Sequence, residues 1–131
     1  MIRKRRSELI HIADSLFSKY ARISRADKDG AVVCICCGKP VHWSGTDPAH
    51  FVGRACMVLR WQLSNVWPCH RTCHDAANHL DKYEATLIKT QGQEFVDDLK
   101  TRGYQYHKDP SEEEITEIIE DLTLKLKEYG N

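Results

Sequence analysis

The sequence contains no long apolar run, no net charge, no internal repeat and no low-complexity segment. Nowhere does it approach the ~20 apolar residues that a membrane-spanning helix needs, so we expect no membrane partner. The basic first residues are followed by no apolar signal core, and we therefore expect an intracellular, cytoplasmic protein. At 131 residues the chain has the usual length of a single domain.

The zero net charge hides an uneven distribution. Residues 1–74 hold 12 Lys and Arg against 5 Asp and Glu, whereas residues 75–131 hold 7 against 14. A basic half is what a protein face that binds a polyanion needs, and DNA is the partner that we expect. The acidic half is more simply a solvated helical surface.

The first six residues form a short basic arm. Its charged members are Arg3, Lys4, Arg5 and Arg6. They are either a solvated, frayed terminus or an arm that contacts DNA phosphates.

The pattern of apolar residues predicts an α+β fold that is mostly helical, in one domain over residues 1–131. Residues 7–27 are predicted to form an N-terminal helix with Ser7 as its cap. The apolar face of this helix would contain Leu9, Ile12, Leu16, Phe17, Tyr20 and Ile23.

A small core containing strands is predicted for residues 31–90, and helices for residues 93–130. Short extended segments are expected at Ala31–Ile35, Val41–Trp43, Thr46–Val52 and Val58–Trp61. A helix should run from Arg71 through Ile88 until Gly92, and another over Glu94–Arg102 until Gly103. Ser111 and Glu114 have the spacing of a capping box at the start of the last helix.

Six cysteines in a chain without a signal core point to metal or redox chemistry rather than to disulfides. Cys34-x-x-Cys37 followed by Gly38 between two extended segments is typical of a zinc knuckle. A thioredoxin-type redox pair would precede a helix, which the sequence does not predict here. Cysteines buried without a metal are the other alternative. Tetrahedral zinc needs two further ligands, which Cys73 and either Cys69 or His70 can supply.

A second set of polar residues is interleaved with these cysteines. His74 and Asn78 are spaced to share one face of the predicted helix, so both could bind one ion, and Asp47 could add a carboxylate. His50 could take a proton from water, and the amide of Asn65 could orient its imidazole.

The order His50, Asn65, His74 resembles the HNH, or ββα-metal, nucleases. In that family the first His is the general base, the Asn follows on a loop, and metal ligands lie on the next helix. The matching positions in this chain are His74 and Asn78. The resemblance implies a small zinc-stapled ββα core, with an N-terminal helix before it and two to three C-terminal helices after it.

A more extensive similarity is to the phage lambda NinG (Rap) family of recombination nucleases. It is carried by C-I-C-C-G, W-S-G-T-D-P-A-H-F, L-R-W-Q-L-S-N-V-W and C-H-D-A-A-N, and it covers most of the chain from Ser7. This family usually has Cys at the position of His70, and often Gly at that of Ala49. The similarity implies a phage- or prophage-encoded endonuclease in a bacterial host, which cuts Holliday junctions and D-loops.

The implied mechanism uses one Mg²⁺ or Mn²⁺ ion on His74 and Asn78, with Asp47, while His50 activates water. Arg54, Arg60 and Arg71 flank this site and would contact phosphates, or be merely solvated. Two symmetric cuts in a junction would suit a homodimer. The competing hypothesis is a zinc-stapled DNA-binding module without catalysis, which would leave the His and Asn residues without a role.

Overall fold

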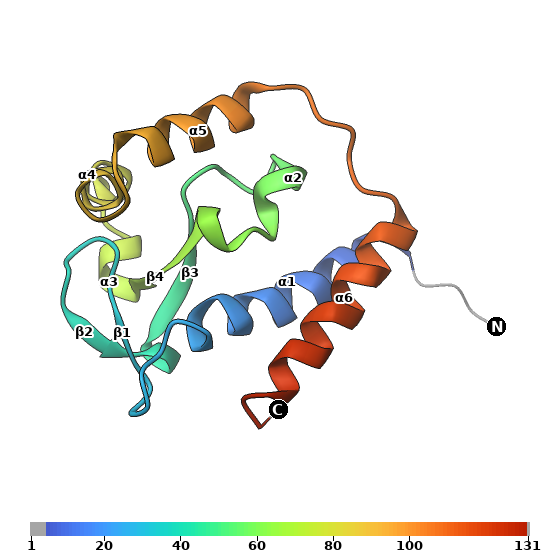
Figure 1. The fold of residues 1–131 in the computed structure, drawn as a ribbon, viewed down its shortest axis with the longest axis horizontal. Coiled ribbons are helices and arrows are strands. Elements are labelled where there is room, and N and C mark those ends of the chain that lie inside the picture. The colour runs from blue at the N-terminus through green and yellow to red at the C-terminus, as the bar shows by residue number, and fades with distance from the viewer. Residues whose placement is uncertain (1–4, 131) are drawn as a thin grey trace.

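A two-stranded antiparallel ribbon lies at the centre of the computed structural model, which describes residues 5–130 (Figure 1). Its strands are β3 (Thr46–His50) and β4 (Val66–His70), paired so that Ala49 lies opposite Trp67. The α+β, mostly helical class that the sequence predicts is confirmed. Among the described residues, no helix is both long and apolar enough to cross a membrane.

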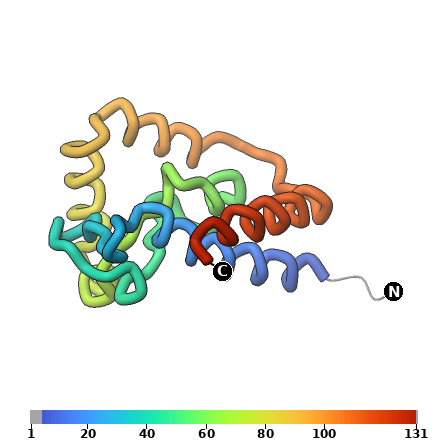
Figure 2. Tube along the Cα trace, turned by 60° about the horizontal axis from the view of Figure 1, so that its bottom comes forward, coloured from blue at the N-terminus to red at the C-terminus, as the bar shows by residue number. Residues whose placement is uncertain are grey.

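Helices α1 (Arg6–Ile23) and α6 (Glu112–Lys127) pack side by side and run in the same direction (Figures 1 and 2). Their starts meet where Arg6 Nη1 donates to the Pro110 carbonyl, and their ends meet where the rings of Tyr20 and Tyr129 are in contact. Val66 of β4 is buried against this pair, together with Phe17. The helix pair therefore covers one side of the ribbon.

Helices α4 (His79–Gln91) and α5 (Gln93–Tyr104) belong to a second core with the opposite side of the ribbon. Tyr83 of α4 is fully buried, and its hydroxyl donates to the Ala49 carbonyl over 2.8 Å. The two helices are separated at Gly92, which has a φ of 97° that glycine adopts without strain. This confirms the predicted break.

A second, smaller hairpin carries the cysteine knuckle. Strand β1 (Ala31–Val33) pairs with β2 (Pro40–His42), and the turn between them holds Cys34 to Lys39. The Ile35 N–H donates to the Pro68 carbonyl over 2.9 Å, which joins this turn to β4. The extended segments predicted at Ala31–Ile35 and Thr46–Val52 are confirmed but shorter, and the one at Val41–Trp43 is shifted by one residue.

The predicted bounds of the first helix are wrong at both ends. It begins at Arg6 with Arg5 as the cap, so Ser7 lies inside it, and it ends at Ile23. It cannot continue to residue 27, because the Asp27 carboxylate accepts the N–H groups of Asp29 and Ala31 in a turn. The fully buried face is Leu9, Ala13, Phe17 and Ala21, where two alanines permit close helix packing.

Three predictions for later elements are also wrong. Residues 58–61 are not extended, because Met57–Arg60 form the short helix α2, which is followed by the 3₁₀ turns η2 (Leu63–Asn65). The helix expected from Arg71 is interrupted: α3 covers only Arg71–His74, and Asn78 is the N-cap of α4. Gly103 lies inside α5, where a Cβ would come within 2.9 Å of Val52 Cγ1. The capping box of Ser111 and Glu114 is confirmed.

Arg25 joins the end of α1 to the ribbon. Its guanidinium donates to the carbonyls of Leu63 and Val66, and its carbon lies 4.0 Å from the centre of the Trp67 ring. Burial lowers the pKa of Arg25 to about 10, so it remains charged at neutral pH.

We expect Arg25→Met to lower the free energy of unfolding by about 2–4 kcal/mol, because two partly buried carbonyls would lose a charged donor. Arg102→Met should change it by less than about 1 kcal/mol, since the ion pair of Arg102 with Asp98 is long and largely exposed to solvent. Urea unfolding at one fixed zinc concentration measures both. An equal loss in the two variants would contradict this role for Arg25.

Candidate functional site

Three of the predicted zinc ligands converge. The sulfur atoms of Cys34, Cys37 and Cys73 all lie within 4.8 Å of one another, and residues 5–130 contain no other group of three such ligand atoms this close. Cys34 and Cys37 come from the knuckle between β1 and β2, and Cys73 from α3. Three thiols are a donor set that fits zinc, so this group could hold a metal ion.

The hydrogen bonds around Cys34 favour its thiolate. Burial raises the pKa of Cys34, but backbone N–H groups that include those of Cys37 and His70 outweigh it and lower the pKa to about 7. Burial raises the pKa of Cys73 to about 11. A bound cation would favour the thiolate at both positions.

The two candidates for a fourth ligand lie in different surroundings. Cys69 is fully buried, and its thiol donates to Cys36 Sγ over 3.3 Å. His70 lines a cavity of about 350 Å³ together with the three converging cysteines. Its Nδ1 already contacts the Thr72 hydroxyl at 2.7 Å. His70 is therefore the better placed of the two, with Nε2 as the remaining donor atom.

His50 lies at the end of β3 and is held by one hydrogen bond. Its Nε2 lies 2.9 Å from the Arg60 carbonyl, and a carbonyl can only accept, so Nε2 carries the proton. Nδ1 then keeps a lone pair. Burial is the largest cause that lowers the pKa of His50, and the charges of Arg54 and Arg60 lower it further. The ring lines a cavity of about 180 Å³ that Arg54 also lines.

The sequence predicts that the Asn65 amide orients the His50 imidazole directly. In the structure, the hydrogen bonds of the Asn65 side chain go to backbone groups instead. Its Oδ1 accepts the Val52 N–H, and its Nδ2 donates to the carbonyls of Val52 and Leu59. All three bonds lie within 3.2 Å, and the side chain is fully buried. Asn65 thus fixes the loop between His50 and β4. Arg60, which supplies the carbonyl that holds His50, lies in this loop.

Asp47 and His74 are brought together. His74 Nδ1 lies 3.1 Å from Asp47 Oδ2, and Asp47 Oδ1 accepts from Arg71 Nε over 3.3 Å. Asn78 does not share a helical face with His74, because the chain leaves the helix at Asp75. Asn78 is exposed and makes no cap hydrogen bond through its side chain.

His50 and Asp47 point to opposite faces of β3, since they are three residues apart in a strand. Asp47 faces α3, whereas His50 lines its cavity with Asp14 and Ser18 of α1. The structure therefore forms two separate clusters, one around His50 and one around His74.

The predicted DNA-binding arginines divide into two kinds. Arg60 forms an ion pair with Asp14, in which its Nη2 lies 2.6 Å from Oδ2. Arg6 donates a hydrogen bond to the Pro110 carbonyl. Arg54 and Arg71 are exposed beside the two clusters. Arg5 is exposed at the start of α1, whereas Arg3 and Lys4 lie outside the described residues.

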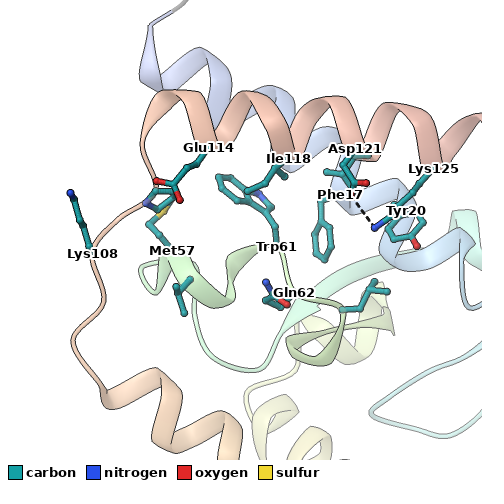
Figure 3. Close-up of a pocket in the computed structure, with 14 residues that line it drawn as sticks. Phe17, Tyr20, Met57, Trp61, Gln62, Lys108, Glu114, Ile118, Asp121 and Lys125 are labelled. Carbon is teal, nitrogen blue, oxygen red and sulfur yellow. Dashed lines mark ion pairs between the residues drawn. The ribbon is translucent and has the colours of Figure 1, made fainter.

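A larger cavity of about 510 Å³ lies between α1, α6 and the loop after α2 (Figure 3). Apolar rings such as Phe17 and Trp61 share its lining with the ion pair of Asp121 and Lys125. None of the described residues that line it belongs to the predicted site. Its lining belongs to the packing between α1 and α6.

The comparisons with known proteins settle the family. The model of the family described as Bacteriophage Lambda NinG protein matches residues 2–131. The chain belongs to the NinG family. No curated protein and no solved structure matches it. The match confirms the NinG family that the sequence motifs indicated. The motif C-I-C-C-G contains Cys34 and Cys37, two of the three converging thiols of this NinG-family chain.

Replacing Cys73 should remove the metal from the thiol cluster. We expect Cys73→Ser to lose most of the zinc that the parent retains, about one ion per chain, because a tetrahedral site needs all its ligands. Cys56→Ser is the matched control, since Cys56 lies outside the cluster. Elemental analysis of the purified proteins measures zinc per chain. Full zinc content in Cys73→Ser would exclude Cys73 as a ligand.

Proposed function

We propose that this NinG-family protein is a metal-dependent endodeoxyribonuclease that cuts branched recombination intermediates, such as Holliday junctions and D-loops. The observation that carries the proposal is the state of His50. Its Nε2 is tied to the Arg60 carbonyl, its pKa is lowered, and its Nδ1 is left as a base. Membership of the family supports the DNA substrate.

The proposed reaction is hydrolysis of one phosphodiester bond. Nδ1 of neutral His50 takes a proton from water as the water oxygen attacks phosphorus. The bond from phosphorus to the 3′-oxygen breaks, that oxygen takes up a proton from solvent water, and the products are a 5′-phosphate and a 3′-hydroxyl. The exposed guanidinium of Arg54 lies at the same cavity and can contact the phosphate.

The catalytic Mg²⁺ or Mn²⁺ would bind beside the contacting pair of His74 and Asp47. Carboxylate and imidazole groups fit such an ion, and their side chains are in contact. When bound, the ion would stabilise the charge that develops on the leaving oxygen. Arg71, whose side chain is 62% exposed beside Asp47, would contact a neighbouring phosphate.

Two further features belong to the proposal. The zinc site would fix α3, which carries both Cys73 and His74. Two symmetric cuts in a four-way junction need two copies of the site, which a two-fold homodimer would supply.

His50→Ala should abolish cleavage while leaving DNA binding intact. We expect a rate at least about 100-fold lower on a labelled four-way junction with Mg²⁺ or Mn²⁺, because a general base contributes about that much or more. His11→Ala is the control, since His11 is exposed on α1. A linear duplex and a reaction with EDTA complete the set.

Two results would oppose this reading. Cleavage by His50→Ala at the parent rate would exclude His50 as the base. If the parent binds junctions but cuts none with either metal, the chain is a zinc-stapled DNA-binding module instead.

The pH profile gives a separate test of His50. The neutral ring is the active form, so the rate should fall as the pH drops through the pKa of His50. Burial places that pKa below the ordinary value of 6.5, so the acid limb should be centred below pH 6.5. Initial cleavage rates between pH 5 and pH 8 (roughly the range in which histidines titrate) measure it. A midpoint above 7 would contradict the assignment.

A further inference from the structure

We infer that His74 and His79 together bind a divalent transition-metal ion through their Nε2 atoms, and that Asp47 holds His74 in place rather than binding the ion. His79 takes the place expected for Asn78. The inference rests on the proposed function for the ion's catalytic role, but its ligands are argued from the geometry alone.

The hydrogen bond between His74 and Asp47 fixes the tautomer of His74. Its Nδ1 lies 3.1 Å from a carboxylate oxygen, which can only accept, so Nδ1 carries the proton and Nε2 keeps a lone pair. Metal-binding histidines usually donate their other N–H to a carboxylate or a carbonyl in this way.

Asp47 is engaged through both oxygens. One accepts from His74 and the other from Arg71 Nε over 3.3 Å. Direct coordination of an ion by Asp47 would have to share an oxygen with one of these two donors. Its position fits the second shell, where a carboxylate orients a histidine ligand and increases its basicity.

His79 repeats the arrangement of His74. Its Nδ1 lies 3.2 Å from the Ala76 carbonyl, so Nδ1 is again the protonated nitrogen, and Nε2 again has a free lone pair. Both imidazoles therefore have the tautomer that leaves Nε2 available for a metal.

The separation of the two ring centroids fits one shared ion. Their centroids are 5.3 Å apart and their planes meet at 84°. Two imidazoles that bind one ion at about 2.1 Å have ring centroids roughly 5 Å apart. The break in the helix at residues 75–78 makes this possible, because residues five apart on a continuous helix lie on different faces.

The donor set selects the kind of ion. Imidazole nitrogen binds transition-metal ions such as Co²⁺ or Ni²⁺ well, and even Mn²⁺, which binds most weakly in this series, accepts it more readily than Mg²⁺, which prefers oxygen ligands. Two imidazole ligands should therefore bind Mn²⁺ in preference to Mg²⁺. Among the two ions that the nuclease proposal allows, this inference selects Mn²⁺.

The experiment is a titration of the zinc-loaded protein with Mn²⁺, followed by the electron paramagnetic resonance signal of free Mn²⁺. We expect His74→Ala and His79→Ala to weaken Mn²⁺ binding at least about tenfold, and Asp47→Asn by about tenfold, as for second-shell partners. Asn78→Ala and the control His11→Ala should stay within about twofold of the parent, since neither is a ligand. A tenfold excess of Mg²⁺ over Mn²⁺ should displace no more than about half of the bound Mn²⁺ (about tenfold or greater selectivity).

His79→Gln provides a second variant at the same position, because glutamine can still donate to the Ala76 carbonyl. It should lose Mn²⁺ binding as His79→Ala does. Circular dichroism and zinc content report whether each variant is folded.

The inference is overturned if the parent binds no Mn²⁺, if Mg²⁺ displaces it readily, or if folded His79→Gln binds it like the parent. Loss of binding in Asn78→Ala alone would also overturn it, in favour of Asn78.

Junction cleavage separates the two proposals. A parent that binds Mn²⁺ through His79 but cuts no branched DNA keeps this site and loses the nuclease. A His79→Gln variant that binds Mn²⁺ and cuts branched DNA like the parent would exclude His79 as a ligand and leave the nuclease proposal standing.

Discussion

The buried amide of Asn65 is the interaction on which the rest of the central region depends. A buried amide without partners costs about 1–3 kcal/mol per group, and this one is fully bonded to Val52 and Leu59. It closes the loop between the two strands of the ribbon. That loop contains α2, whose last residue, Arg60, supplies the carbonyl that holds His50. Asn65 therefore acts on the proposed base through the backbone, and its effect on the ring is indirect.

The short helix α3 connects two kinds of metal chemistry. Cys73 points to the thiol cluster and His74 to Asp47, although the two residues are adjacent in sequence. A four-residue helix has little stability of its own, so packing and a bound ion would have to hold it. A metal on the thiols would thus set the direction of His74. The proposed nuclease depends on this link, because the imidazole has to be fixed before an ion can bind it in one geometry.

Much of the positive charge in the first half of the chain is used inside the protein. Arg25 donates to the backbone carbonyls of Leu63 and Val66, and Arg60 forms a two-bond pair with Asp14. Arg54 and Arg71 remain exposed near the two clusters. The exposed surface of this half is consequently less basic than the count over residues 1–74 indicates.

The sequence by itself determined the family, the mostly helical α+β class, the cysteine knuckle and the capping box, because each depends on residues close together in the chain. It did not determine which residues meet across the fold. The periodicity from Arg71 onward fits one helix, yet the chain turns at residues 75–78, and this separates His74 from Asn78 and brings His79 to His74. The contact of Asn65 with Val52 and the pairing of Cys69 with Cys36 depend on packing between distant segments. Local propensity cannot foresee these choices, since the burial that decides them exists only in the folded chain.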